Sequence, residues 1–307
     1  MKDKTAKKRE HSMLSFVTRE SRDETPPASG RGRRGSELPY FATLTVLAAL
    51  FLLPIALVLM NSLKSTLYIS GEPFALPSAE SFVGLRNYAE GLRMGGFFLA
   101  LLRSLFISVA SVALLGIACS MCAWYLARQE SRLSKILYYS LIFGMVVPFQ
   151  MVMYSSTLLI GKAGLNTVLG MPVVYLGFGA SLTVFVLSGF VRSLPIAVEE
   201  AAMIDGCSPL GTFFRVALPL MRPSLISVSV LNAMWVWNDY LLPYLVLGSR
   251  RQTVPVAIQL SMTGAYGSTN LGGLMAMLIL SMIPIVLFYL FGQKHILEGV
   301  SLGAVKG

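Results

Sequence analysis

Charged side chains are scarce in this chain. Only 13% of its 307 residues are Asp, Glu, Lys or Arg, about half the fraction usual in soluble domains. Hydrophobic residues make up 55%, and the mean hydropathy is +0.68. Charge-poor runs of about 20 residues, each long enough to cross a bilayer as a helix, recur about six times. A soluble domain is therefore excluded, and the composition predicts an all-α polytopic membrane protein with six transmembrane helices.

Side chains that often carry catalysis or bind metals are also few. His11 and His295 are the only histidines, and both lie outside the apolar runs. Cys119, Cys122 and Cys207 form an odd set without a disulfide framework or the spacing of metal ligands. We therefore predict no metal site and no cofactor, and we assign Cys119 and Cys122 to packing.

Two further absences argue against an enzyme. Gly161-Lys162 is followed by Ala163 and lacks the upstream glycine of a phosphate-binding loop. Asp239 is the only acidic residue within a predicted span, so no carboxylate pair is available for acid–base catalysis. The chain is predicted not to be an enzyme. A membrane-embedded hydrolase or a stand-alone secondary transporter is the distant alternative, and activity of the purified chain without partners would reveal it.

The predicted spans divide the chain into two regions. Residues 1–37 are polar and basic and are predicted to be a disordered cytoplasmic extension, and residues 38–307 are the membrane region. Within it we expect spans at about 38–63, 103–128, 136–160 with a break at Pro148, 171–191, 223–247 and 271–291. The core of the region is placed at about 98–293 and its tail at 294–307.

The net charge of +10 is unevenly distributed. Ten of the 25 basic residues lie in the first 37 positions, which argues against a nucleic-acid-binding surface. That extension could bind anionic lipid headgroups, or it could only help to set the topology. With the N-terminus inside, 18 basic residues fall on the inner side and seven on the outer side. Without the extension the inner count is eight, so charge alone supports this orientation weakly.

A polar interruption, Arg192–Pro223, separates two apolar runs and predicts a pair of short helices. Ser193 is predicted to cap the first helix, and Ser208 the second. Gly206 lies between them, where a helix end needs positive φ, and Pro219 is predicted to end the second helix. Apolar residues recur at helical spacing: Leu194, Ala197, Val198, Ala201 and Ala202, then Leu210, Phe213, Phe214 and Ala217. Helices this short need a surface to lie on.

The spacing of Glu200-Ala201-Ala202, Gly206 and Leu218-Pro219 resembles the EAA loop of ABC importer permeases. Val216 stands where the family has Ile. The resemblance implies a cytoplasmic element that docks on an ATPase subunit. The coupling residues that it implies are Glu200, Ala201, Ala202, Asp205, Gly206, Leu218 and Pro219. We therefore expect replacement of Glu200 to weaken retention of the ATPase and uptake much more than replacement of Glu199. An ordinary amphipathic hairpin at the membrane surface is the alternative.

Trp237-Asn238-Asp239 resembles the family's Trp-Asn-acid motif in its fifth helix. An unpaired carboxylate inside a bilayer costs about 2.5–3.5 kcal/mol on insertion scales, so Asp239 must face protein or water. Together with Gln150, these residues are candidates for a pore-lining or gating cluster. An interhelical hydrogen-bonded knot is an equally good interpretation.

Most of the chain after residue 38 is similar to one subfamily, the shorter six-helix permease subunit of maltose-type carbohydrate importers. Asn61-Ser62-Leu63-Lys64 carries this resemblance, and so does the terminal Gly303-Ala304-Val305-Lys306-Gly307. The resemblance implies a type I ABC importer transmembrane fold with both termini cytoplasmic, in a bacterial inner membrane. It also implies that residues 303–307 reach toward the ATPase.

The resemblance further implies a function and a set of partners. The chain would form half of the pathway for a sugar or oligosaccharide, coupled to ATP hydrolysis. Its partners would be a second, longer permease subunit, an ATP-binding-cassette ATPase dimer, an extracytoplasmic solute-binding protein and the lipid bilayer. The external loop between the fifth and sixth helices would contact the binding protein. A glycerol phosphodiester or a polyol is the alternative solute.

Overall fold

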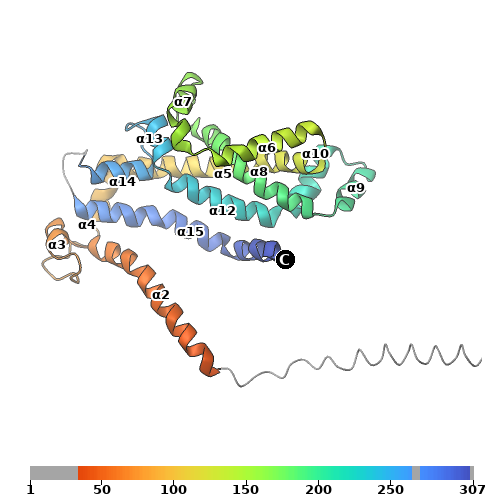
Figure 1. Cartoon of the computed structure of the whole chain (residues 1–307). Helices are drawn as coiled ribbons and strands as arrows, with labels where there is room; N and C mark the ends of the chain where they lie inside the picture. The colour runs from red at the N-terminus through yellow and green to blue at the C-terminus, as the bar shows by residue number, and fades with distance from the viewer. Residues whose placement is uncertain (1–33, 265–269, 305–307) are drawn as a thin grey trace, which may run out of the picture. The chain divides into compact units, whose positions relative to one another are not determined.

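The computed structural model of the chain describes residues 34–264 and 270–304, and these are almost entirely helical (Figure 1). The chain divides into two units, residues 1–56 and 57–307. The helices are α2 (Arg34–Asn61), α3 (Thr66–Gly71), α4 (Arg86–Arg93), η1 (Met94–Gly96), α5 (Phe97–Arg128), α6 (Arg132–Val146), α7 (Phe149–Lys162), α8 (Met171–Ser193), α9 (Ile196–Ile204), α10 (Pro209–Thr212), η2 (Phe213–Ala217), α11 (Leu218–Leu220), α12 (Arg222–Asn238), α13 (Leu241–Leu247), α14 (Val254–Met262) and α15 (Leu271–Ala304).

Most of α2 belongs to the first unit, and it is apolar on every side. All of its side chains from Pro39 to Ala56 are exposed, including Phe51 at 77%. The hydroxyls of Thr43 and Thr45 donate to backbone carbonyls one turn earlier. A helix with an all-round apolar surface and internally bonded hydroxyls is suited to a lipid environment.

The second unit has a core of four long helices, α5, α8, α12 and α15 (Figure 1). A buried cluster that includes Leu115, Leu187 and Val228 joins α5, α8 and α12. Gly179 lets α8 approach its neighbours closely, because a Cβ there would lie 3.0 Å from the Leu115 side chain and 3.1 Å from that of Trp235. Close packing of small residues is a common way for helices to associate in membranes.

The number of membrane-crossing helices depends on how two bends are counted. Among the residues that the structure describes, four helices are long and apolar enough to cross a bilayer. Two bent pairs raise this number to six: α6 with α7, bent by 110°, and Pro209–Leu220 with α12, bent by 77°. The predicted all-α polytopic architecture is confirmed, and Pro148 lies at the first bend, as expected from its missing N–H.

The predicted fifth span, 223–247, is not one continuous helix. α12 ends at Asn238, and Asp239 has an extended backbone with φ −72° and ψ 122°. The Oδ1 atom of Asp239 then accepts hydrogen bonds from the backbone N–H groups of Leu241, at 3.1 Å, and Leu242, at 3.4 Å. A carboxylate satisfies the free N–H groups at a helix start, so Asp239 separates two helices instead of lying inside one.

The polar stretch that follows the first predicted span is folded around Lys64. This lysine is only 1% exposed, and its Nζ donates to the carbonyl oxygens of Glu72 and Ala75, both at 2.8 Å. Asn87 of α4 donates to the carbonyls of Ser62 and Lys64. A buried ammonium is tolerated because it is hydrogen-bonded, and composition alone did not indicate this.

Candidate functional site

The segment Arg192–Pro223 lies at one end of the bundle, and α13 and α14 lie at the other (Figure 1). α9 begins at Ile196, after two extended residues, Leu194 and Pro195. The prediction that Ser193 caps this helix was wrong. α8 continues through Ser193, whose hydroxyl donates to the Phe190 carbonyl at 2.7 Å. The hydroxyl is therefore used within the last turn of α8.

The turn between the two short helices agrees with the prediction. Gly206 has φ +89°, a backbone conformation that L side chains rarely adopt. The Ser208 hydroxyl accepts a hydrogen bond from the N–H of Gly211 at 3.2 Å and so caps α10. Both the predicted left-handed glycine and the predicted serine cap are confirmed.

Pro219 does not end the second helix, contrary to the prediction. The chain passes through a π-helical turn, Phe213–Ala217, and continues through α11 to Leu220. Proline lacks the N–H that would close the usual i to i−4 bond, and a local π turn is one way for a helix to accommodate such a loss. The helical path therefore continues past Pro219 to Leu220, and the 77° bend comes after it, before α12.

Glu199 of α9 is the most deeply buried acidic residue at this end of the bundle. It is 1% exposed, and its carboxylate faces the last two turns of α5. Arg128 donates to Oε1 through its NH2 group at 2.7 Å and to both oxygens through Nε at 3.1 Å. The indole Nε1 of Trp124 donates to Oε2 at 2.9 Å. The buried charge is thus both paired and hydrogen-bonded, as burial requires.

Trp124 and Arg128 also contact other parts of the segment. Arg128 donates to the carbonyl of Leu194 at 3.2 Å. The ring of Trp124 lies 5.6 Å from that of Phe213, centroid to centroid. The two α5 residues are four positions apart and therefore share one face of the helix. One face of α5 consequently contacts α9, η2 and the extended link before α9.

The other face of the segment is open. Glu200, Ala201, Asp205, Gly206 and Pro219 are exposed, while Ala202 and Leu218 are half-buried. Apolar side chains beside them are exposed as well: Val198 at 45%, Met203 at 45%, Ile204 at 86% and Leu210 at 60%. The apolar residues of α9 thus do not rest on the bundle, and its one buried residue is acidic. An exposed apolar patch with acidic neighbours is typical of a protein-binding surface.

Sequence reasoning missed Trp124 and Arg128. Arg128 is 71 positions from Glu199, and Trp124 is 75 positions away. The only local signal was a tryptophan and an arginine one turn apart at the end of an apolar run. Such a pair is common at membrane interfaces, and it does not indicate a contact with Glu199.

At the other end of the bundle, the groups that bind Asp239 within the described part of the chain are all neutral. Besides the two N–H groups of α13, the Tyr175 hydroxyl on α8 donates to Oδ2 at 3.0 Å. Trp237 points elsewhere and donates to the Ser281 carbonyl on α15 at 3.2 Å. Asn238 is exposed and donates to the Met234 carbonyl of its own helix. Tyr175 links two helices through Asp239, as the knot interpretation expects.

The four predicted gating residues therefore do not form one cluster. Gln150 is exposed in the first turn of α7 and makes no hydrogen bond to the other three among the described residues. Trp237 packs with Phe97 and Ala100 of α5 in a separate buried cluster. The two terminal residues of the predicted ATPase-facing tail that the structure describes, Gly303 and Ala304, end α15, and Val305, Lys306 and Gly307 lie outside the described residues.

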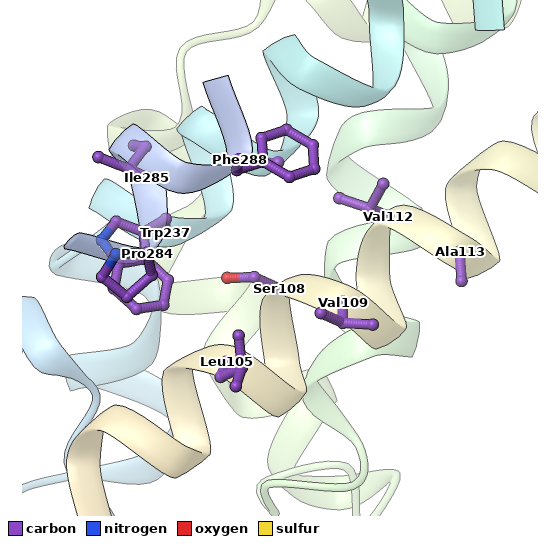
Figure 2. Close-up of a pocket in the computed structure, with 10 residues that line it drawn as sticks. Leu105, Ser108, Val109, Val112, Ala113, Trp237, Pro284, Ile285 and Phe288 are labelled. Atoms are coloured by element: carbon purple, nitrogen blue, oxygen red, sulfur yellow. The ribbon is translucent and has the colours of Figure 1, made fainter. Parts of the chain in front are cut away.

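An apolar cavity of about 350 Å³ lies between α5, α12 and α15 (Figure 2). Its walls are formed by Leu105, Ser108, Val109, Val112, Ala113, Ala233, Trp237, Pro284, Ile285 and Phe288. The Ser108 hydroxyl faces this space in Figure 2 and has no hydrogen-bond partner among the described residues. Ser108 supplies the one hydroxyl among these wall residues, so the cavity offers few hydrogen bonds to the hydroxyl groups of a sugar.

Comparison with known proteins gives consistent matches. Residues 116–301 match the family model described as the binding-protein-dependent transport system inner membrane component. The chain is 36% identical over 264 residues to AmyC of Thermoanaerobacterium thermosulfurigenes, described as a starch degradation products transport system permease protein, covering 85% of this chain and 94% of that one. It is 35% identical over 273 residues to MsmG of Streptococcus mutans, a multiple sugar-binding transport system permease protein, covering 87% and 96%.

A solved structure shares the fold. It is a chain of a bacterial ABC transporter involved in the import of the acidic polysaccharide alginate, and it superposes with a TM-score of 0.72 at 22% identity. The alignment covers 87% of this chain and 99% of that one. The fold is therefore that of a type I ABC importer permease. With the family match over more than half of its length, the chain belongs to the binding-protein-dependent transport system inner membrane components, a family of multi-pass membrane proteins.

Proposed function

We propose that this chain is one permease subunit of an ABC importer for a sugar or oligosaccharide in a bacterial inner membrane. Paired with a second, longer permease subunit, it forms half of the translocation pathway. The names of AmyC and MsmG support a carbohydrate as the solute, and the family description supports delivery by a solute-binding protein. The importer, not this subunit, hydrolyses ATP.

The observation that carries the proposal is the two-sided Arg192–Pro223 segment. Its inner face is fixed to the bundle through Glu199, and its outer face presents Glu200 beside Val198, Met203 and Ile204. An isolated soluble surface would not favour Ile204 at 86% exposure. A partner that covers this face would bury the apolar side chains and desolvate Glu200. We assign that partner as the ATPase dimer.

This assignment sets the orientation of the chain. The segment faces the cytoplasm, and both termini lie on the same side. The α12–α13 end then faces outward, where the solute-binding protein delivers its cargo. The tail at 303–307 would reach toward the ATPase from the cytoplasmic end of α15.

Glu200 provides the test. If Glu200 pairs with a cation of the ATPase in a desolvated groove, loss of one partner costs about 2–5 kcal/mol, whereas an exposed ion pair contributes about 0–1 kcal/mol. We expect Glu200→Ala to weaken co-purification of the ATPase and lower ATP-driven uptake, and Glu200→Arg to do so more strongly. Pull-down of the ATPase at matched membrane levels measures the effect.

Glu130 is the matched control, because it is exposed and lies just beyond the end of α5, outside the segment. Glu130→Arg is expected to retain the ATPase. If Glu200→Arg retains the ATPase and transports like the unmodified chain, the segment does not couple as proposed. Uptake of a malto-oligosaccharide, compared with a glycerol phosphodiester and a polyol, tests the solute class separately.

A further inference from the structure

The Arg192–Pro223 segment has two covalent connections to the bundle, and neither leads to α5. Before α9, the extended residues Leu194 and Pro195 join it to α8, with ψ angles of 137° and 121°. After η2, the chain enters α12 through a 77° bend. Displacement of the segment would therefore reach α8 and α12 through the backbone. It would reach α5 only through side chains.

Trp124 and Arg128 contribute to that side-chain connection beside the buried apolar cluster that Met221 shares with Ala123 and Leu126, and we call these two residues the α5 clamp. Three separate parts of the segment are held by it: the carboxylate of Glu199, the carbonyl of Leu194 and the ring of Phe213. Phe213 is fully buried, and the Arg128 side chain is 17% exposed. Separation of the segment from α5 would leave a carboxylate and a guanidinium partly desolvated and unpaired, which is strongly unfavourable.

α5 extends from this clamp to the opposite end of the bundle. Its 32 residues span about 48 Å at 1.5 Å per residue. At the far end, Phe97 and Ala100 are completely buried beside Trp237 and Met277. One continuous helix thus contacts both the Arg192–Pro223 segment and the Trp237 cluster.

We propose that Trp124 and Arg128 are positioning residues that make α5 move together with α9 and η2, so that displacement of the segment reaches the Trp237 end of the bundle. This inference rests on the proposed coupling function. It assigns the neighbouring acids different tasks: Glu200 faces the ATPase, and Glu199 joins the segment to α5. The clamp acts after the ATPase has docked, so its loss uncouples hydrolysis from the solute without releasing the ATPase.

The test uses the assembled importer in proteoliposomes with its binding protein and a malto-oligosaccharide. Arg128→Gln and Trp124→Phe each remove part of the clamp, and Glu199→Gln removes the charge of the carboxylate that it holds. We expect all three to retain the ATPase in pull-down and to keep basal hydrolysis within about twofold. The stimulation of hydrolysis by loaded binding protein should fall about fivefold or more in Arg128→Gln, the lower end of typical coupling between sites.

Two comparisons distinguish a positioning role of the α5 clamp from a general effect of the substitutions on stability. Arg132→Gln is the matched control, since Arg132 is an exposed arginine at the start of α6 with no ion pair among the described residues. It should be stimulated like the unmodified chain. Combining Arg128→Gln with Glu199→Gln should reduce stimulation little further than either change alone, because both break one connection. The exchange Arg128→Glu with Glu199→Arg should recover part of the stimulation.

Normal stimulation of an assembled Arg128→Gln importer would overturn the inference, and so would independent, multiplying effects of the two changes. If Arg128→Gln does not assemble, Trp124→Phe decides, because it leaves the Arg128–Glu199 ion pair intact, keeps an aromatic ring beside Phe213 and loses the N–H donor. Release of the ATPase by Trp124→Phe would also contradict the inference. The proposed function fails in a different way: the unmodified importer would then neither retain the ATPase nor import the sugar.

Discussion

The two ends of the bundle hold a carboxylate in different ways. Glu199 is almost completely buried and is paired with the guanidinium of Arg128. Asp239 is half-buried and is bound by a phenol hydroxyl and two backbone N–H groups, all neutral. The first arrangement requires two opposite charges, and the second requires only hydrogen-bond acceptors. Substitutions at the two ends should therefore differ both in size and in which replacements are tolerated.

The largest effect is expected for Glu199→Ala. Removal of one partner from a buried ion pair leaves the other charge uncompensated, at a cost of about 3–5 kcal/mol. The expectation from the sequence that Glu199 matters less than Glu200 concerns retention of the ATPase, whereas this prediction concerns the stability of the chain. The thermal stability of the detergent-purified chain measures the effect, with Glu130→Ala as the exposed control. Similar melting temperatures for the two variants would show that the ion pair contributes no stability.

At the opposite end, Asp239→Leu should cost about 1–3 kcal/mol, because it leaves the buried Tyr175 hydroxyl without its partner. Asp239→Asn keeps a carbonyl oxygen for the N–H groups of α13 and should be tolerated better. The same stability measurement, together with uptake, compares the two variants. Impaired uptake of a fully stable Asp239→Asn would favour a gating role over the hydrogen-bonded knot.

Gly206→Val tests the geometry of the segment without changing its charge. A β-branched residue at φ +89° is strained by about 1–2 kcal/mol, although no neighbouring atom lies within 4 Å of the added Cβ. We expect normal insertion, with reduced uptake and reduced solute-stimulated hydrolysis. Gly161→Val is the control, since its Cβ would also meet nothing within 4 Å and its φ is not positive. Full transport by Gly206→Val would show that the turn geometry is dispensable.

The smallest effect is expected between the two ends, at the apolar cavity. Ser108→Ala removes a hydroxyl that has no partner among the described residues, so stability should change by less than about 0.5 kcal/mol and uptake should remain normal. Loss of uptake at unchanged stability would show that the cavity participates in transport. That result would add the cavity beside α5 as a third site to the comparison of the two ends.

Several features followed from short stretches of sequence. Helices form wherever apolar runs are long enough to satisfy their own backbone groups in lipid, and Pro148 lies at the bend between α6 and α7. The turn at Gly206 and the cap at Ser208 depend on residues within a few positions of one another, so both could be predicted from the local sequence. The predictions for Ser193, Pro219 and the fifth span were wrong. The Ser193 hydroxyl bonds within α8, the helix continues past Pro219 after a π-helical turn, and the Asp239 carboxylate accepts from the backbone at the start of α13. The local sequence also permits each of these arrangements.

The sequence by itself therefore determined the class of the protein, the approximate spans and the location of the Arg192–Pro223 segment. Only the tertiary structure decided which of two adjacent glutamates is buried, because that depends on Trp124 and Arg128, more than 70 positions away. It likewise decided that Asp239 binds Tyr175 while Trp237 turns toward α15. A local pattern sets which residues can share a helix face, but the helix that packs against that face determines whether a carboxylate meets a cation, a hydroxyl or solvent.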